Sequence, residues 1–192
     1  MRQRIIYTRF DGGVNDCQPS DEVKAFMTRG GGWYQHIGHW FRGYREYEIE
    51  KMINHGHSKR LAVKFVDALD VGGLTDAEYF EIIREHDCAK WGTGFELWDV
   101  DDVPTDRWFR NAWHRSANGG PISIDLEKAR PIQAAHIDSA VKAANKRTDG
   151  VMKFFTLQRP MVKVNFRHIA NRIKDAKDEF QLRAIWPEGL AA

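Results

Sequence analysis

The fold is decided by the stretch SKRLAVKFVDALDVGGLTDAEYFEII, residues 58–83, which contains two complete helix signatures in succession. In the first, Ser58 is a typical N-cap, and large apolar residues recur at helical spacing from Leu61 to Leu69. Two glycines then end this helix, because glycine readily adopts the conformation that a helix end requires. In the second, the sequence TDAE at residues 75–78 is a capping box, which predicts a further helix.

Similar signals occur elsewhere in the first two thirds of the chain. Ser20, followed by two acidic residues, predicts a helix that the glycines at 30–32 end. We also expect a helix over residues 38–54, which Gly43 weakens, and another over residues 105–113. Several short, capped helices in one chain are typical of a small helical bundle.

The β content that the sequence predicts is smaller. The sequence RIIYTR at residues 4–9, the DGG turn after it and the segment 14–17 predict an N-terminal hairpin. Residues 95–100 and 122–124 have the composition of short strands, and we expect the last of these to pair with the hairpin.

The sequence after residue 125 is richer in alanine and in basic residues. Asp125 begins a helical pattern that continues to about Arg147. Proline lacks an amide, so we expect either a kink at Pro131 or a helix that starts just before it. The segment 149–164 is predicted to be a linker, and Asn165 to cap a final helix that restarts near the C-terminus.

The predicted fold class is therefore α+β and predominantly helical. It is a small helical bundle with a minor antiparallel β element, made of the N-terminal hairpin and short strands, and a C-terminal helical extension. We expect two parts: an aromatic-rich helical domain at residues 1–125 and a basic helical extension at residues 126–192.

Charge is distributed unevenly along a chain whose net charge is only +2. Residues 140–183 contain 11 Lys and Arg against 4 Asp and Glu, whereas residues 1–139 contain 18 against 22. The asymmetry indicates a partner for the C-terminal part, either an acidic protein surface or nucleic acid. The alternative is a solvated helical face with no partner.

The two cysteines indicate a reducing compartment. Cys17 and Cys88 are 71 positions apart and form no CxxC motif, so both are expected to be free thiols. The start of the chain is too poor in apolar residues for a signal peptide, and no apolar run is long enough for a membrane span. We therefore expect a protein that works in a cytosol of bacterial type or in a particle assembled there, without a membrane partner.

Clusters of histidine and aspartate are the candidate metal ligands. His36 with His39, and His55 with His57, are close pairs, but none of these spacings is a zinc signature. The four aspartates between residues 99 and 106 lack the glycine and distal glutamate of a calcium loop. The alternative is that these are surface or loop residues, and we predict no metal and no other cofactor.

The segment WFRNAWHR at residues 108–115 combines tryptophan with arginine, as nucleic-acid and protein interfaces do. The alternative is that Trp108 and Trp113 belong to the core. No phosphate-binding glycine loop, GxSxG elbow or HExxH motif is present, so no catalytic residue is predicted. The candidate binding residues are Arg107, Arg110, Arg115, Lys142, Lys146, Arg147, Arg167 and Arg172.

Four motifs carry a resemblance to a known group. They are IYTR followed by DGGV at residues 6–14, GGLT at 72–75, DRWFRNAW at 106–113 and the terminal Trp186-Pro187. They resemble uncharacterised proteins of phages and prophages of alphaproteobacteria, most specifically in the Asp-Arg-x-Phe-Arg-x-Ala-Trp element. The resemblance implies a small phage protein that is structural, assembly-related or directed at a host system.

Three hypotheses about function remain after the sequence analysis. The leading one is a non-enzymatic phage-related protein that binds a phage or host protein, in assembly or in host takeover. The second is a regulator that binds nucleic acid or an inhibitor of a host nuclease complex. The third is a metal-dependent enzyme that uses the histidine and aspartate clusters.

Overall fold

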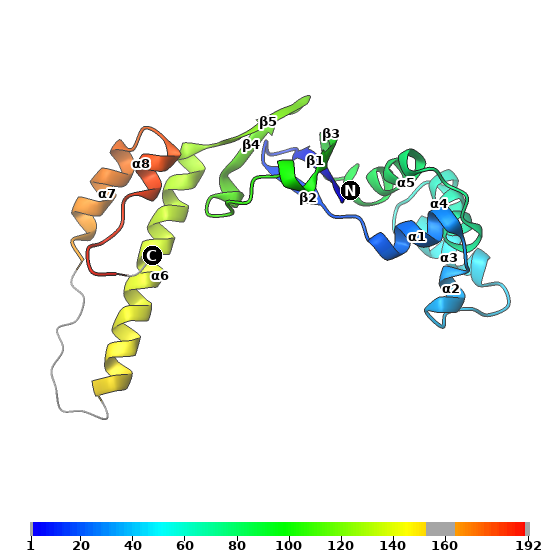
Figure 1. Cartoon of the computed structure of the whole chain (residues 1–192), viewed down its shortest axis with the longest axis horizontal. Helices are drawn as coiled ribbons and strands as arrows, with labels where there is room; N and C mark the ends of the chain where they lie inside the picture. The colour runs from blue at the N-terminus through cyan, green and yellow to red at the C-terminus, as the bar shows by residue number, and fades with distance from the viewer. Residues whose placement is uncertain (1, 153–163, 191–192) are drawn as a thin grey trace. The chain divides into compact units, whose positions relative to one another are not determined.

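The chain divides into two compact units, shown in the computed structural model of Figure 1. Unit 1 comprises residues 1–104 and 115–121, and unit 2 comprises residues 105–114 and 122–192. The structure describes residues 2–152 and 164–190. The boundary expected at residue 125 stays a prediction, whereas in the structure the segment 105–114 groups with the C-terminal helices.

Unit 1 contains a three-stranded antiparallel sheet in the order β2-β1-β3. The predicted N-terminal hairpin is confirmed, because Thr8 lies opposite Val14 and Ile5 lies opposite Cys17. The other edge of β1 pairs with β3, where Ile5 lies opposite Leu97. The strands are β1 (Gln3–Arg9), β2 (Val14–Cys17) and β3 (Gly92–Asp99).

The helices of unit 1 all lie between β2 and β3 in the chain, and their caps follow the sequence signals. The Ser20 and Ser58 hydroxyls accept the amides of Val23 and Leu61, and both bonds of the box at residues 75–78 form. The elements are α1 (Asp21–Arg29), α2 (Trp33–His36), α3 (Tyr44–Asn54), α4 (Lys59–Val71), α5 (Asp76–Ile83) and the π-helical turn η1 (Arg84–Cys88).

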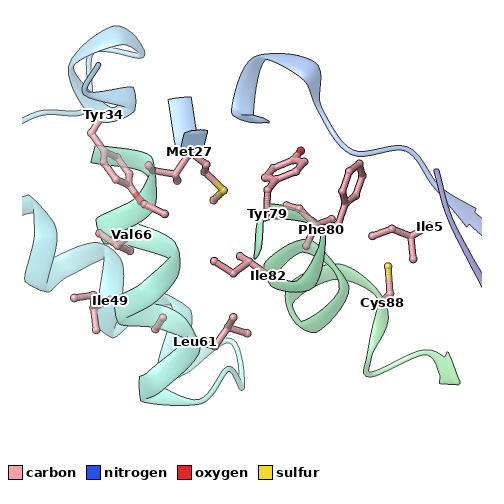
Figure 2. Packing of buried hydrophobic residues seen from close by; sticks show 14 of the residues in the cluster. Ile5, Met27, Tyr34, Ile49, Leu61, Val66, Tyr79, Phe80, Ile82 and Cys88 are labelled. Carbon is pink, nitrogen blue, oxygen red and sulfur yellow. The ribbon is translucent and has the colours of Figure 1, made fainter. Parts of the chain in front are cut away.

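The core of unit 1 is made by these helices and one face of the sheet. Figure 2 shows Met27, Val66 and Ile82 gathered in one apolar layer, with Ile5 of β1 beside Cys88. The ends of α1 and α4 meet closely, because a Cβ on Gly72 would lie 2.2 Å from the amide nitrogen of Gly30. Glycine is therefore required there to let the two helix ends touch.

Unit 2 is formed mainly by the C-terminal helices. Its centre is Gln133, whose side chain is fully buried and accepts from the Trp108 indole at 2.8 Å while donating to the Ile185 carbonyl at 2.8 Å. Apolar residues surround this pair of bonds, including Ile137 and Leu182. The elements are the 3-10 turn η3 (Arg110–Ala112) and the helices α6 (Leu126–Met152), α7 (Phe166–Asp175) and α8 (Glu179–Arg183).

The remaining elements are a hairpin and a short turn. Strands β4 (Trp113–Ser116) and β5 (Gly119–Ile124) pair as a two-stranded sheet, and η2 (Val100–Asp102) follows β3. Their residues divide between the units, since 115–121 belong to unit 1 and the rest of the hairpin to unit 2.

The prediction of a predominantly helical bundle is wrong. The structure is a mixed α/β fold, with 53% of the chain in helices and 17% in strands of two small antiparallel sheets. The sequence analysis predicts too little strand in part because it starts β3 at residue 95, whereas the strand begins three residues earlier, at Gly92. Glycines at 92 and 94 lower the β propensity of this strand, which hides its start in the sequence. Gly92 is nevertheless needed in the structure, because a Cβ there would lie 2.1 Å from the Thr8 carbonyl oxygen.

Two element predictions in the middle of the chain are also wrong. Residues 105–113 do not form a helix, because Asp106 accepts the Trp108 amide in a local turn and the chain is extended from Trp113. The strand that contains residues 122–124 pairs with β4 and not with the N-terminal hairpin.

Helix predictions differ from the structure at two further places. The helix expected over 38–54 begins only at Tyr44, because Gly43 is in the left-handed conformation at its N-cap. Helix α6 begins at Leu126 and continues both through Pro131 and past the break expected at Gly150. Most of the predicted linker, residues 153–163, lies outside the described residues.

No helix in the described part of the chain is both long enough and apolar enough to cross a lipid bilayer.

The core position expected for Trp113 is confirmed, since only 2% of it is exposed, although it lies on a strand. We predict that Trp113→Ala lowers the free energy of unfolding by roughly 3–5 kcal/mol, because it deletes a large buried ring. Urea denaturation followed by circular dichroism measures the change. Trp91→Ala is the matched control, because Trp91 is 56% exposed and its loss should cost less than about 0.5 kcal/mol. Equal effects of the two substitutions would contradict the burial of Trp113.

Candidate functional site

A pocket of about 560 Å³ in unit 1 is the site with the richest chemistry. It lies among α2, α3, α4 and η1, and apolar side chains such as Trp33 and Phe65 form part of its wall. Four histidines line it, together with Glu48 and two lysines. The histidines are His39, His55, His57 and His86, and the lysines are Lys51 and Lys90. An apolar wall with a few polar groups is typical of ligand pockets.

Three rings form a stack in this pocket. The His86 ring lies between those of His57 and Phe65, with ring centroids 4.4 Å apart on each side and interplanar angles of 12° and 22°. Asp87 fixes the orientation of His86, because its carboxylate lies 2.7 Å from Nδ1 of that ring. The stack is possible because α5 continues into the π-helical turn η1, a rare irregularity that is frequent at functional sites.

Two histidines come from the corner between α3 and α4. Gly56, in the left-handed region, turns the chain there between His55 and His57. The Nδ1 atom of His55 lies 2.7 Å from the Lys51 carbonyl, so this nitrogen donates and Nε2 of the neutral ring is left as an acceptor. Burial lowers the pKa of His57 below its ordinary value, and the nearby His86 and Lys90 lower it further. His57 therefore favours the neutral form.

An exposed cluster of large apolar side chains begins at the edge of the pocket. We call it the aromatic patch; it consists of Ile37, Trp40, Phe41 and Tyr47, which are 39%, 56%, 46% and 53% exposed. Ile37 also lines the pocket. Sequence reasoning missed the patch because it placed residues 38–54 in a single helix. The signal that locates it is the pair of glycines at 38 and 43, which interrupt that helix.

The histidines predicted as metal ligands are only partly brought together. His39, His55 and His57 line the pocket, whereas His36 lies 3.1 Å from Glu22 and contacts the Phe26 ring. Among the described residues, no group of three or more His, Cys, Asp or Glu side chains is arranged to hold a metal ion.

The basic residues predicted to bind a partner are divided between the two units. Unit 1 contains Arg115, and unit 2 contains the other seven. The Arg107 guanidinium lies 4.8 Å from the centroid of the Trp113 ring, and Lys142 pairs with Asp138 of its own helix at 2.6 Å. The side chain of Arg147 lies outside the described part. The exposed members are Arg110, Lys142, Lys146, Arg167 and Arg172.

Arg115 is a structural residue of unit 1. Its side chain is fully buried and donates to the Gly94 carbonyl at 2.6 Å, and the same nitrogen lies 3.2 Å from the Glu96 carboxylate. Glu96 in turn accepts the Gly120 amide at 3.0 Å. Burial lowers the pKa of the Arg115 guanidinium. These contacts attach residues 115–121 to β3, so Arg115 offers no surface to a partner.

No protein-family model, no curated protein and no solved structure matches this chain.

We predict that the pKa of His57 measured by NMR titration is below 6.5, and that Lys90→Gln raises it because a nearby positive charge is removed. A lowered pKa in the folded state means that His57 contributes stability above pH 6.5, which is lost as the pH falls through that pKa. Lys59→Gln is the control and should leave the titration unchanged. An unaltered pKa of His57 in Lys90→Gln would contradict this account of the pocket.

We predict that Arg115→Ala lowers the free energy of unfolding by about 3 kcal/mol, because it removes a fully buried side chain and leaves the Gly94 carbonyl without its donor. Arg167→Ala removes an exposed arginine and should cost less than about 0.5 kcal/mol. Chemical denaturation distinguishes the two. A stability of Arg115→Ala equal to that of the unmodified chain would show that the buried Arg115 side chain is not needed.

Proposed function

We propose that this protein acts by binding another protein through the aromatic patch, with the histidine-lined pocket beside it receiving a side chain of the partner. The observation that carries the proposal is the exposure of the patch: four large apolar side chains lie open within eleven residues. Exposed large apolar side chains gathered in one short segment are a feature of interaction sites in soluble domains.

The patch is held in place before any partner binds. The Trp40 ring lies 6.1 Å from that of the buried Tyr44, and the Phe41 and Tyr47 rings meet edge to face at 5.6 Å. Fixed aromatic side chains lose little conformational entropy on binding, which is why tryptophan and tyrosine are common at the energetic centres of interfaces. This organisation supports a binding role for the patch.

The pocket supports the same proposal by its position and its charge. Ile37 belongs to both features, so an apolar side chain of the partner can enter the pocket while its backbone covers the patch. Lys51 pairs with Glu48 at 3.4 Å, so Lys90 supplies the remaining positive charge at the pocket, which favours a partner with a carboxylate next to its apolar anchor. The resemblance to phage proteins supplies a setting, in which the partner belongs to an assembling particle or to host machinery.

Site-specific photo-crosslinking tests the proposal. A benzophenone amino acid replaces Trp40 in one variant and Phe180 in another; Phe180, which is 77% exposed, is in unit 2. The proposal expects a dominant protein adduct from position 40, which mass spectrometry identifies, and none of that adduct from position 180. Adducts that nuclease removes would favour nucleic acid and would overturn the proposal.

Calorimetry with the purified partner then measures the contribution of the patch. Trp40→Ser should weaken binding roughly thirtyfold, because truncating a central aromatic anchor costs about 2 kcal/mol or more. Phe180→Ser should leave the affinity unchanged, since it removes an even more exposed aromatic ring from unit 2. Equal affinities of the unmodified chain and of Trp40→Ser would overturn the proposal.

A further inference from the structure

The two cysteines, 71 positions apart in the sequence, lie next to each other in unit 1. Cys17 is the last residue of β2 and is half-buried, and Cys88 is the last residue of η1 and is fully buried. Cys17 lies directly opposite Ile5 on β1, so the two side chains share one face of the sheet. Figure 2 shows the Cys88 sulfur directed toward Ile5. The sheet register therefore brings Cys17 to the place that Cys88 faces.

The two thiols are neighbours in the core. Cys17 packs against the apolar cluster that includes Cys88, and each thiol shifts the pKa of the other. Both are free thiols in the structure.

The surroundings make the two thiols chemically different. Cys88 lowers the pKa of Cys17 by acting as a hydrogen-bond donor to the Cys17 thiolate. Cys17 and burial raise the pKa of Cys88. Because thiolates and not thiols are the nucleophiles, the half-exposed Cys17 is the residue that reacts first with a reagent from solution.

We propose that Cys17 and Cys88 form a redox-active dithiol, which low-molecular-weight disulfides oxidise to an intramolecular disulfide. The Cys17 thiolate attacks one sulfur of the reagent RSSR, forming a Cys17–SR mixed disulfide and releasing RS⁻. Cys88 then loses its proton and attacks the Cys17 sulfur, which releases the second RS⁻. In total the dithiol is oxidised by two electrons, RSSR is reduced to two RSH, and both thiol protons pass to the released thiolates.

The competing explanation is that both cysteines only fill space in the core, as buried thiols often do. The positions of the two cysteines in the chain indicate that oxidation would also change the stability of unit 1. A bond between Cys17 and Cys88 would close a long loop that contains all five helices of unit 1. Such a crosslink restricts the unfolded chain strongly, so oxidation should stabilise unit 1.

The test equilibrates the purified full-length chain with glutathione buffers of increasing oxidation, then blocks free thiols by alkylation and maps the peptides by mass spectrometry. The proposal expects a Cys17–Cys88 peptide pair that dithiothreitol reverses, and a thermal midpoint about 10 °C higher in the oxidised chain. Two alkylated thiols after equilibration with oxidised glutathione would overturn it, as would disulfides that form only between chains.

Two variants resolve the order of the steps. Cys88→Ala should accumulate glutathione on Cys17, because the second step is blocked, whereas Cys17→Ala should leave Cys88 unmodified, because that thiol is buried. Neither variant should show a rise in thermal midpoint with oxidised glutathione. Glutathione on Cys88 and none on Cys17 would overturn the assignment of Cys17 as the attacking thiol. The mapping on the unmodified chain tests the proposal even if a variant fails to fold.

Discussion

The antiparallel pairing of β1 with β3 is the constraint on which unit 1 depends. It pairs Ile5 with Leu97, about ninety residues later, and every α-helix of the unit lies in the chain segment between the two strands. Closing so long a loop has an entropic cost that local contacts do not recover, so the helices must pack on one face of the sheet. Ile5 and Tyr7 supply that face, and both are buried against the helical core.

The helical segment between the strands explains where the candidate sites lie. Helices α1, α4 and α5 pack into the core, whereas the segment from Gly38 to Gly43 makes a turn with a glycine at each end. A Cβ at either glycine would meet nothing within 4 Å, so the space beside both positions is open. The exposed Trp40 and Phe41 come from this turn, which is where a binding surface can differ without disturbing the sheet.

Local structure was predictable where one side chain determines it. The caps at Ser20, Ser58 and Thr75 and the N-terminal hairpin follow directly from the sequence, because each depends on contacts within a few residues. The partner of β1 was not predictable, since pairing with β3 is decided by tertiary packing. The histidine pocket was found only in part for the same reason: His55 and His57 are neighbours in sequence, but their contact with His86 requires the packing of α4 against η1.

The π-helical turn η1 connects the two candidate sites of unit 1. His86 on this turn completes the ring stack of the pocket, and Cys88, two residues later, faces β1 and contacts Cys17. A regular helix would rotate each residue by about 100°, and the wider π turn changes which side chains share a face. Positions at which a chain departs from its regular pattern are those where function most often overrides local preference. Because His86 and Cys88 share one five-residue turn, a covalent bond at Cys88 acts on the backbone that positions the His86 ring.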